Sequence, residues 1–188
     1  RYDCALVVGA DEEKMEKIRA SMLSLTKGWN QEHIASIVRE KTEGNPLFIA
    51  RNAAGGVQAI TTRPALAVPT SQIATGLLVL FGTGQYLTDS DPADTTIESF
   101  YGIWDNGATG TVARSQLQAQ TIVAETTSNG LDVRETSNTP VDWSVRRGWY
   151  MDLVSPSAPS AGGERVTTNP IVRYDRVIFV TLKPLNDE

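Results

Sequence analysis

Short apolar runs separated by glycine, proline and polar turns make up most of the chain from Asn45 onward. The densest is residues 77–81 (LLVLF), followed by Gly82-Thr83-Gly84, an acidic loop and an aromatic run at 100–104 (FYGIW). Runs this short, bounded by glycine, favour buried strands over helices. Asp105-Asn106-Gly107 has the composition of a tight turn. We therefore expect residues 77–107 to form one antiparallel β unit.

The same pattern predicts about ten short strands in all. A hairpin is expected from strands 47–50 and 57–61 around a turn at 52–56. Pro64 and Pro69 flank strand 65–68, which is therefore expected to be short or at an edge. The loop at 155–163 is flexible by composition, and turns are expected at Asn169-Pro170 and Tyr174-Asp175. The remaining strands are expected at 118–125, 133–136, 141–144, 149–153, 164–168, 171–173 and 177–182.

Residues 1–44 follow a different pattern, so we expect two parts, 1–44 and 45–188. A strand at 4–8 precedes two helices, capped by Asp11 and Asn30. All but one of the lysines lie in the first part, whereas all nine prolines lie in the second. The apolar helical positions are Met15, Ile18, Met22 and Leu25 in the first helix, and Ile34, Ile37 and Val38 in the second.

Composition narrows the class of protein. With 188 residues and 40% apolar content, the chain can bury one sizeable core. A net charge of −5 gives no basic surface for a phosphate backbone, so nucleic-acid binding is disfavoured. No apolar run approaches the roughly 20 residues of a membrane span, and no signal peptide is visible, so a secreted form would need an N-terminus elsewhere. A single cysteine, Cys4, excludes an internal disulfide and a cysteine-based zinc site.

Asp89, Asp91 and Asp94 are the nearest approach to a metal site. A D-x-D-x-x-D loop supplies some of the oxygen ligands that calcium requires, but its register differs from an EF-hand loop. We therefore favour an ordinary solvated loop over a calcium site.

Other chemical candidates are weak. His33 is the only histidine and has no nucleophile motif near it, so we expect a solvated or capping residue. Cys4 lies in an apolar run that favours a buried, inert thiol. Gly82-Thr83-Gly84 lacks the rest of a phosphate-binding motif, and close backbone packing explains it better. The sequence assigns no catalytic, cofactor-binding or metal-binding residue.

The aromatic residues leave two interpretations open. They either fill the core between β-sheets or form an exposed platform for glycans or protein partners, and we favour the first. Arg146-Arg147 is too short a basic pair to indicate more than a solvated turn. The aromatic residues concerned are Tyr101, Trp104, Trp143, Trp149 and Tyr150.

FGTGQYL followed by SFYGIWDNG resembles the C-terminal domain of the PilY/PilC family, the type IV pilus tip-associated adhesins and biogenesis factors. NPLFIARNAAGGVQAITTRP, RSQLQAQTI, GWYMDL and GERVTTNPIV with RVIFVTLKP fit the same pattern in the same order. The resemblance covers roughly 45–184 and leaves 1–44 outside. LSLTKGWNQEHIASIVRE is faintly similar to cap-region helices of haloacid-dehalogenase-like phosphatases, but their D-x-D-x-T motif is absent.

The PilY/PilC resemblance implies a mainly β fold made of partial, modified β-propeller blades. It implies a non-enzymatic role in pilus assembly and surface attachment, with minor pilins and the host surface as partners. The location would be the pilus tip or outer membrane after export. Unpaired blade edges would favour self-association. The family binds calcium at a DxDxD-like loop that is absent here, so no cofactor is expected. The alternatives are a carbohydrate-binding module using surface tryptophans and a quinoprotein-like propeller enzyme fragment.

Overall fold

A computed structural model of the chain describes residues 46–69, 74–108, 110–129, 131–157, 162–174 and 176–184. The strand and the two helices expected within 1–44, together with Cys4 and His33, lie outside these ranges. The chain divides into two compact units, Arg1–Ile49 with Ala108–Val112, and Ala50–Gly107 with Ala113–Glu188. In the described part of the first unit, Phe48 and Val112 form a parallel bridge, and the Val112 N–H donates to the Leu47 carbonyl at 2.8 Å.

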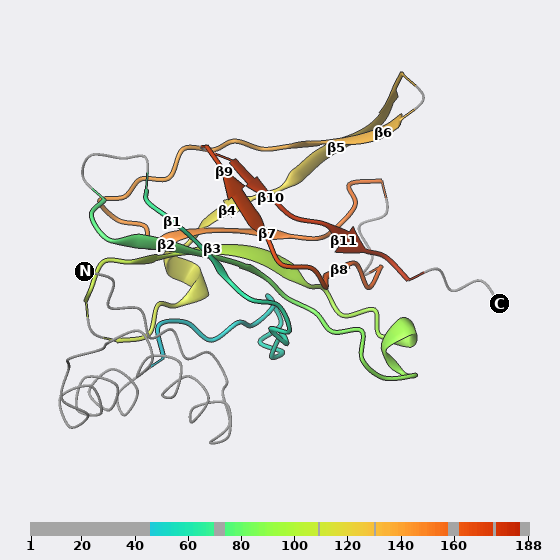
Figure 1. Cartoon of the computed structure of the whole chain (residues 1–188), viewed down its shortest axis with the longest axis horizontal. Coiled ribbons are helices and arrows are strands. Elements are labelled where there is room, and N and C mark those ends of the chain that lie inside the picture. Colours follow the sequence, from blue (N-terminus) through green and yellow to red (C-terminus); the bar gives the residue numbers. More distant parts are fainter. Residues whose placement is uncertain are drawn as a thin grey trace, which may run out of the picture. The chain divides into compact units, whose positions relative to one another are not determined.

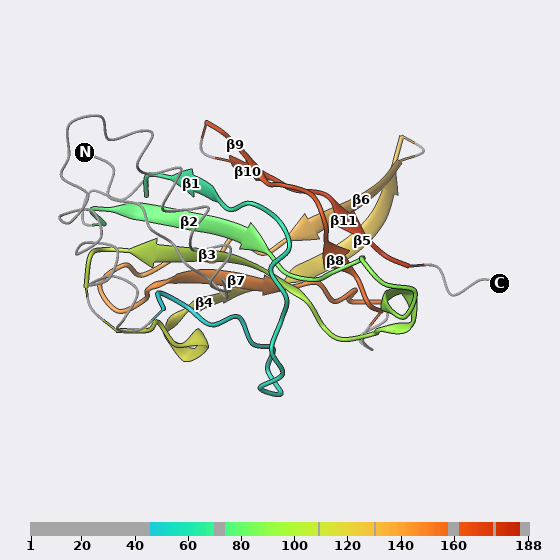
Figure 2. The same cartoon turned by 60° about the horizontal axis from the view of Figure 1, so that its bottom comes forward.

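A five-stranded sheet forms the centre of the second unit, in the order β1-β2-β3-β7-β4 (Figures 1 and 2). The first four strands are mutually antiparallel, like the four-stranded blade of a propeller, and β4 adds to β7 in parallel. The strands are β1 (Ala65–Ala67), β2 (Leu77–Gly82), β3 (Ser99–Asp105), β7 (Gly148–Asp152) and β4 (Gln118–Gln120).

The antiparallel unit predicted for residues 77–107 is confirmed. Strand β2 pairs with β3 from Leu77 opposite Asp105 to Gly82 opposite Phe100. Six of the seven β3 residues are buried, as expected for an apolar, aromatic strand at the centre of a sheet. Two short 3₁₀ helices lie in the loops, η1 (Asp91–Ala93) between β2 and β3, and η2 (Arg114–Gln116) before β4.

Three two-stranded pairs complete the second unit. The β9–β10 hairpin has a two-residue turn, in which Tyr174 has the left-handed φ of 52° that such turns require. The turn predicted at Tyr174-Asp175 is thus confirmed. The pairs are β5 (Ile122–Ser128) with β6 (Leu131–Thr136), β8 (Arg165–Val166) with β11 (Thr181–Leu182), and β9 (Ile171–Arg173) with β10 (Arg176–Ile178).

One hydrophobic core joins the large sheet to the smaller pairs. Its buried members are Leu80, Phe100, Ile122, Met151, Leu153 and Val166, with Val172, Val177 and Phe179 of the C-terminal segment packed against them. Gly82 of β2 lies directly against the Val166 side chain of β8, where any Cβ would collide. The close packing predicted for this glycine is therefore confirmed.

Several strand predictions are wrong. Residues 47–50 and 57–61 form no continuous strands, but the predicted chain reversal is present. Arg51 and Val57 make one antiparallel bridge across the turn, in which the Asn52 Oδ1 accepts from the Ala54 and Gly56 N–H groups. No strand forms at 141–144. Residues 143–145 are a turn instead, and the Asp142 carboxylate accepts from both the N–H and the hydroxyl of Ser144. The strands predicted at 118–125 and 177–182 are each divided in two.

Candidate functional site

The central strand β3 presents two faces of different chemistry. Phe100, Gly102 and Trp104 lie on one face, which also carries Trp149 of β7 opposite Gly102; we call this the Trp149 face. Ser99 and Tyr101 lie on the other, the Tyr101 face, with Tyr150 and Asp152 of β7 opposite them. Each face brings together residues from segments far apart in the sequence.

Arg114 is at the centre of a hydrogen-bonded network on the Tyr101 face. Its Nη2 donates to both Asp152 carboxylate oxygens, at 2.6 and 2.8 Å, and its Nη1 donates to the Tyr101 hydroxyl at 2.5 Å. The guanidinium also lies 3.7 Å from the centre of the Tyr150 ring, a cation–π contact. Burial opposes the positive charge, but the hydrogen bonds to Asp152 outweigh it and raise the pKa of Arg114.

The network continues through Tyr101, Gln58 and Ser99. The Tyr101 hydroxyl donates to the Gln58 Oε1 at 2.6 Å, and burial raises its pKa. The Gln58 Nε2 donates to the Ser99 Oγ at 2.9 Å, and the Ser99 hydroxyl donates to Asp152 at 2.6 Å. Because these groups bond one another, the network acts as a clamp between four chain segments, which carry Gln58, Ser99 with Tyr101, Arg114 and Asp152.

Asp89, Asp91 and Asp94 do not form a shared site. Within the part of the chain that the structure describes, no three acidic, histidine or cysteine side chains are grouped as metal ligands. Asp89 is exposed, and Asp94 accepts from the Thr96 N–H at 2.8 Å.

The solvated-loop prediction is wrong for Asp91, which is only 3% exposed. Its carboxylate accepts from the N–H groups of Leu87 and Thr88, and these bonds hold its pKa well below the usual range. The buried guanidinium of Arg165 fixes the same loop by donating to main-chain carbonyls of Gln85, Asp91, Asp94 and Gly163. The acidic loop is therefore a folded, internally bonded element.

Glu98 is a buried carboxyl beside this loop. It is 7% exposed, and its Oε2 has no hydrogen-bond partner among the described residues. Burial raises the pKa of Glu98 to about 7, with a smaller contribution from the negative charge of Asp94.

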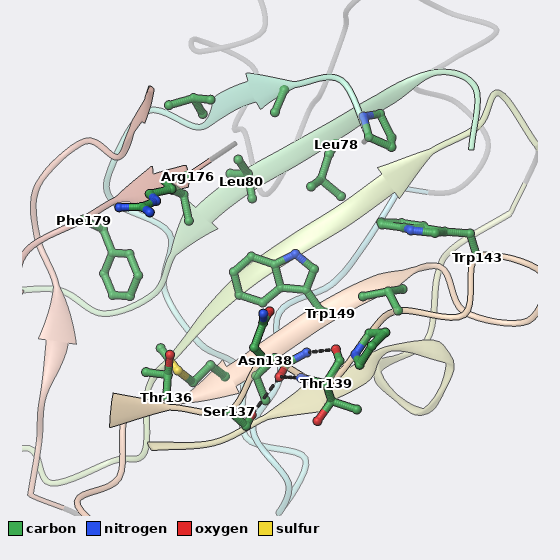
Figure 3. Close-up of a pocket in the computed structure, with 18 of the residues that line it drawn as sticks. Leu78, Leu80, Thr136, Ser137, Asn138, Thr139, Trp143, Trp149, Arg176 and Phe179 are labelled. Atoms are coloured by element: carbon green, nitrogen blue, oxygen red, sulfur yellow. Dashed lines mark hydrogen bonds between the residues drawn. The ribbon is translucent and has the colours of Figure 1, made fainter. Parts of the chain in front are cut away.

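A cavity of about 730 Å³ lies on the Trp149 face. Its floor is the sheet, with Leu78, Leu80 and Trp149, and the β9–β10 segment and residues 136–141 supply the other walls (Figure 3). The cavity is open to solvent on one side, and its lining is more apolar than polar. Arg176 is the only charged residue of the described lining.

The five aromatic residues divide between packing and this cavity. Tyr101 and Trp104 are buried, and the Trp104 indole donates to the Thr75 carbonyl at 2.8 Å. Trp143 meets Trp104 edge to face at 5.6 Å, and both Trp143 and Trp149 line the cavity. The preferred packing interpretation is thus confirmed for Tyr101 and Trp104, while the two other tryptophans also reach open space.

The paired arginines are more than a solvated turn. The Arg146 guanidinium donates to the Ser115 carbonyl at 2.9 Å, and Arg147 donates to the Trp104 carbonyl at 3.3 Å. Arg147 also lies 5.8 Å from the Trp104 ring centre. The pair therefore joins the turn before β7 to β3 and to the segment around η2.

Sequence reasoning missed the Arg114–Asp152 pair and Arg165. The segments RSQLQAQTI and GWYMDL contain Arg114 and Asp152, but nothing in their spacing indicates that the two side chains meet. For Arg165, the only hint in the sequence is an arginine within a β-rich segment, since a guanidinium has five N–H donors that can bind backbone carbonyls.

Comparisons with known proteins agree with this fold. A family model described as the PilY1 beta-propeller domain matches residues 24–139. The crystal structure of the Pseudomonas aeruginosa PilY1 C-terminal domain aligns with a TM-score of 0.66 and 33% sequence identity, covering 74% of this chain and 31% of that one. The chain belongs to the PilY1 β-propeller domain family, and its fold is of that mainly β, propeller-like type.

The similar full-length proteins are type IV pilus biogenesis factors. A PilY1 homolog of Xylella fastidiosa is 35% identical over 139 residues, which is 74% of this chain and 9% of that protein. PilY1 of Pseudomonas aeruginosa strain PAO1 is 34% identical over 174 residues, 82% of this chain and 15% of that protein. The chain thus spans a small part of these relatives. The family match begins at residue 24, so it extends into the segment that the sequence analysis placed outside the resemblance.

Proposed function

We propose that this chain acts in type IV pilus assembly and surface attachment, through protein contacts and without catalysing a reaction. The observation that carries the proposal is family membership over residues 24–139, together with the structural match to a PilY1 C-terminal domain. The partners would be pilus components such as minor pilins, and the host surface. The place of action would be the pilus tip or outer membrane after export.

The chemistry of the Tyr101 face supports a structural role. The Arg114 guanidinium and the Asp152 carboxylate are bonded to each other. A catalytic pair would instead keep a base or nucleophile directed at open space. In the described residues, no helix is long and apolar enough to cross a membrane.

The sheet edges support contact with other proteins. Strands β1 and β4 are the outer members of the five-stranded sheet, and each has only three residues. Open strand edges accept an added strand from a partner or a second copy, and edges of three residues offer few backbone groups for it. We infer self-association through these edges as a second mode of contact. We also infer that neither self-association nor contact with pilus components requires calcium.

The test uses a piliated bacterium that encodes this chain. Deleting the encoding segment in frame should strongly reduce surface pili, counted by electron microscopy, and attachment to host cells. The wild-type segment should restore both. An Asp89→Asn control, changed at an exposed carboxylate, should restore them equally. Wild-type piliation after deletion would contradict the assembly role. Turnover of phosphomonoesters or dye-coupled alcohols, lost on changing one carboxylate, would contradict the non-enzymatic role.

A further inference from the structure

The cavity on the Trp149 face has the form of a ligand site whose floor is one broad aromatic ring. The Trp149 indole lines the cavity (Figure 3). It lies against Gly102, where a Cβ would be 2.6 Å from the indole Nε1. Phe100 stacks beneath it with ring centres 5.9 Å apart, and Phe179 stacks on Phe100 at 4.0 Å. The indole is therefore held in place while it remains only half-buried. A held indole presents a flat apolar surface together with an N–H donor.

Exposed polar groups border the cavity next to a backbone segment that is held in place. The Gln120 side chain binds the Thr139 backbone at both ends, accepting from its N–H at 3.0 Å and donating to its carbonyl at 2.7 Å. This anchors the Asn138-Thr139 segment along the cavity (Figure 3). Among the described residues, the Asn138 amide, the Thr139 hydroxyl and the Trp149 indole N–H form no hydrogen bond, and Asn138 and Thr139 are exposed to water. Amide and hydroxyl groups of this kind fix the orientation of small ligands.

The charge of the cavity selects an anion. The Arg176 guanidinium lies at its edge beside Phe179, and no carboxylate of the described residues forms an ion pair with it (Figure 3). Arg173 is directly opposite Arg176 in the β9–β10 pair. Like charges opposite each other destabilise a strand pair unless a counter-charge is present. This local positive charge occurs on a chain with a net charge of −5.

The shape of the floor favours a saccharide over a peptide. A peptide that docks as an added strand needs an open strand edge. Here the floor is the face of a sheet, whose backbone groups already pair between strands. A pyranose ring instead needs an aromatic surface for its C–H face and amide or hydroxyl groups for its edge. We propose that this cavity binds a carboxylated saccharide, with its ring on Trp149, its hydroxyls on Asn138 and Thr139, and its carboxylate on Arg176.

The experiment measures binding of two probes, trigalacturonic acid and a hyaluronan hexasaccharide, to the purified chain by titration calorimetry. At least one should bind, and its methyl ester, which lacks the charge, should bind about tenfold more weakly. Raising the ionic strength from 0.05 to 0.5 M should weaken binding of the acid form and leave binding of the ester unchanged. Binding of neither acid, or equal binding of acid and ester, would overturn the proposal. Tighter binding of pentaglutamate would likewise overturn it in favour of an acidic peptide.

Three variants assign the binding to this cavity. Arg176→Gln, at an exposed position, should keep the fold and weaken binding of the acid about tenfold. Asn138→Ala should weaken binding of the acid and of the ester by the same factor. Arg63→Gln is the matched control, since Arg63 is exposed and outside the lining, and it should leave affinity unchanged. An equal effect of the two arginine changes would locate binding elsewhere and overturn the proposal. The proposal does not depend on the pilus function, because the measurement is made on the isolated chain.

Discussion

The polar groups on the two faces of the central sheet differ in their hydrogen bonding. On the Tyr101 face, the Arg114 guanidinium, the Asp152 carboxylate and the Tyr101 hydroxyl are bonded to one another. On the Trp149 face, Asn138 and Arg176 line a cavity and have no such bonds among the described residues. Both faces are built by the same strands, β3 and β7. The difference therefore lies in what the flanking loops bring to each face.

A closed network and an open cavity serve different purposes. Hydrogen bonds in a buried network strengthen one another and specify a single arrangement of the segments that carry them. Exposed polar groups beside an aromatic surface are instead available to a ligand. We infer that the Tyr101 face provides stability and that the Trp149 face provides recognition.

The largest expected effect is the loss of stability on opening the closed network. Asp152→Asn keeps the shape of the side chain but removes the charge that pairs with Arg114. The free energy of unfolding should fall by about 3 kcal/mol, because a partly buried guanidinium loses its counter-charge. Urea denaturation monitored by tryptophan fluorescence measures this. Asp89→Asn, at an exposed carboxylate, should change stability by less than about 0.5 kcal/mol. Equal effects of the two changes would show that the network does not stabilise the fold.

Much of the central sheet can be predicted from sequence, and the network cannot. Residues 77–81 and 100–104 are apolar runs between glycine turns, so local pattern suffices for β2 and β3. It fails at 141–144, where Val-Asp-Trp-Ser alternates like a strand but Asp142 bonds locally to Ser144. Arg114 and Asp152 meet only through the fold, because their segments are distant in sequence.

Only some of the residues that line the cavity could be recognised from the sequence. Trp143 and Trp149 belong to the five aromatic residues for which the sequence permits a glycan surface as the less favoured interpretation. Asn138 and Arg176 carry no such signal, since exposed asparagine and arginine occur in every polar loop. Only the register of the β9–β10 hairpin places Arg176 beside the tryptophan surface.

The second prediction concerns Glu98, the buried carboxyl with an unpartnered oxygen. Because its pKa is raised from 4.5 to about 7, the folded chain holds this proton where the unfolded chain has lost it. The free energy of unfolding should therefore fall as pH rises from 4.5 to 7, by at most about 1.4 kcal/mol per pH unit. Denaturation across this range should show the slope in the wild type and lose it in Glu98→Gln. Glu135→Gln, at an exposed position, should retain it. An unchanged slope in Glu98→Gln would assign the proton to another group.

The third prediction concerns a substitution beneath the floor of the open cavity. Gly102→Ala places a methyl group against the Trp149 indole and should cost about 1–2 kcal/mol, because the ring must move. A double-mutant cycle provides the control. In a Trp149→Phe background, where the atom nearest the new methyl is absent, Gly102→Ala should cost less, giving a coupling of at least about 0.5 kcal/mol. Additive costs would show that strain falls on Leu80, the next neighbour, rather than on the indole.

The smallest expected effect tests the unbalanced charge at the edge of the cavity. Arg173→Thr replaces one of two opposed arginines with a residue suited to strands, so stability should rise by about 0.5 kcal/mol at low salt. The gain should shrink in 0.5 M salt, where charge repulsion is screened. Arg63→Thr, outside this strand pair, should give no salt-dependent gain. A loss of stability in Arg173→Thr at both salt concentrations would mean that the arginine stem packs favourably on the hairpin. In that case the positive charge at the Trp149 face would cost the fold nothing, and the contrast with the charge-balanced Tyr101 face would rest on hydrogen bonds alone.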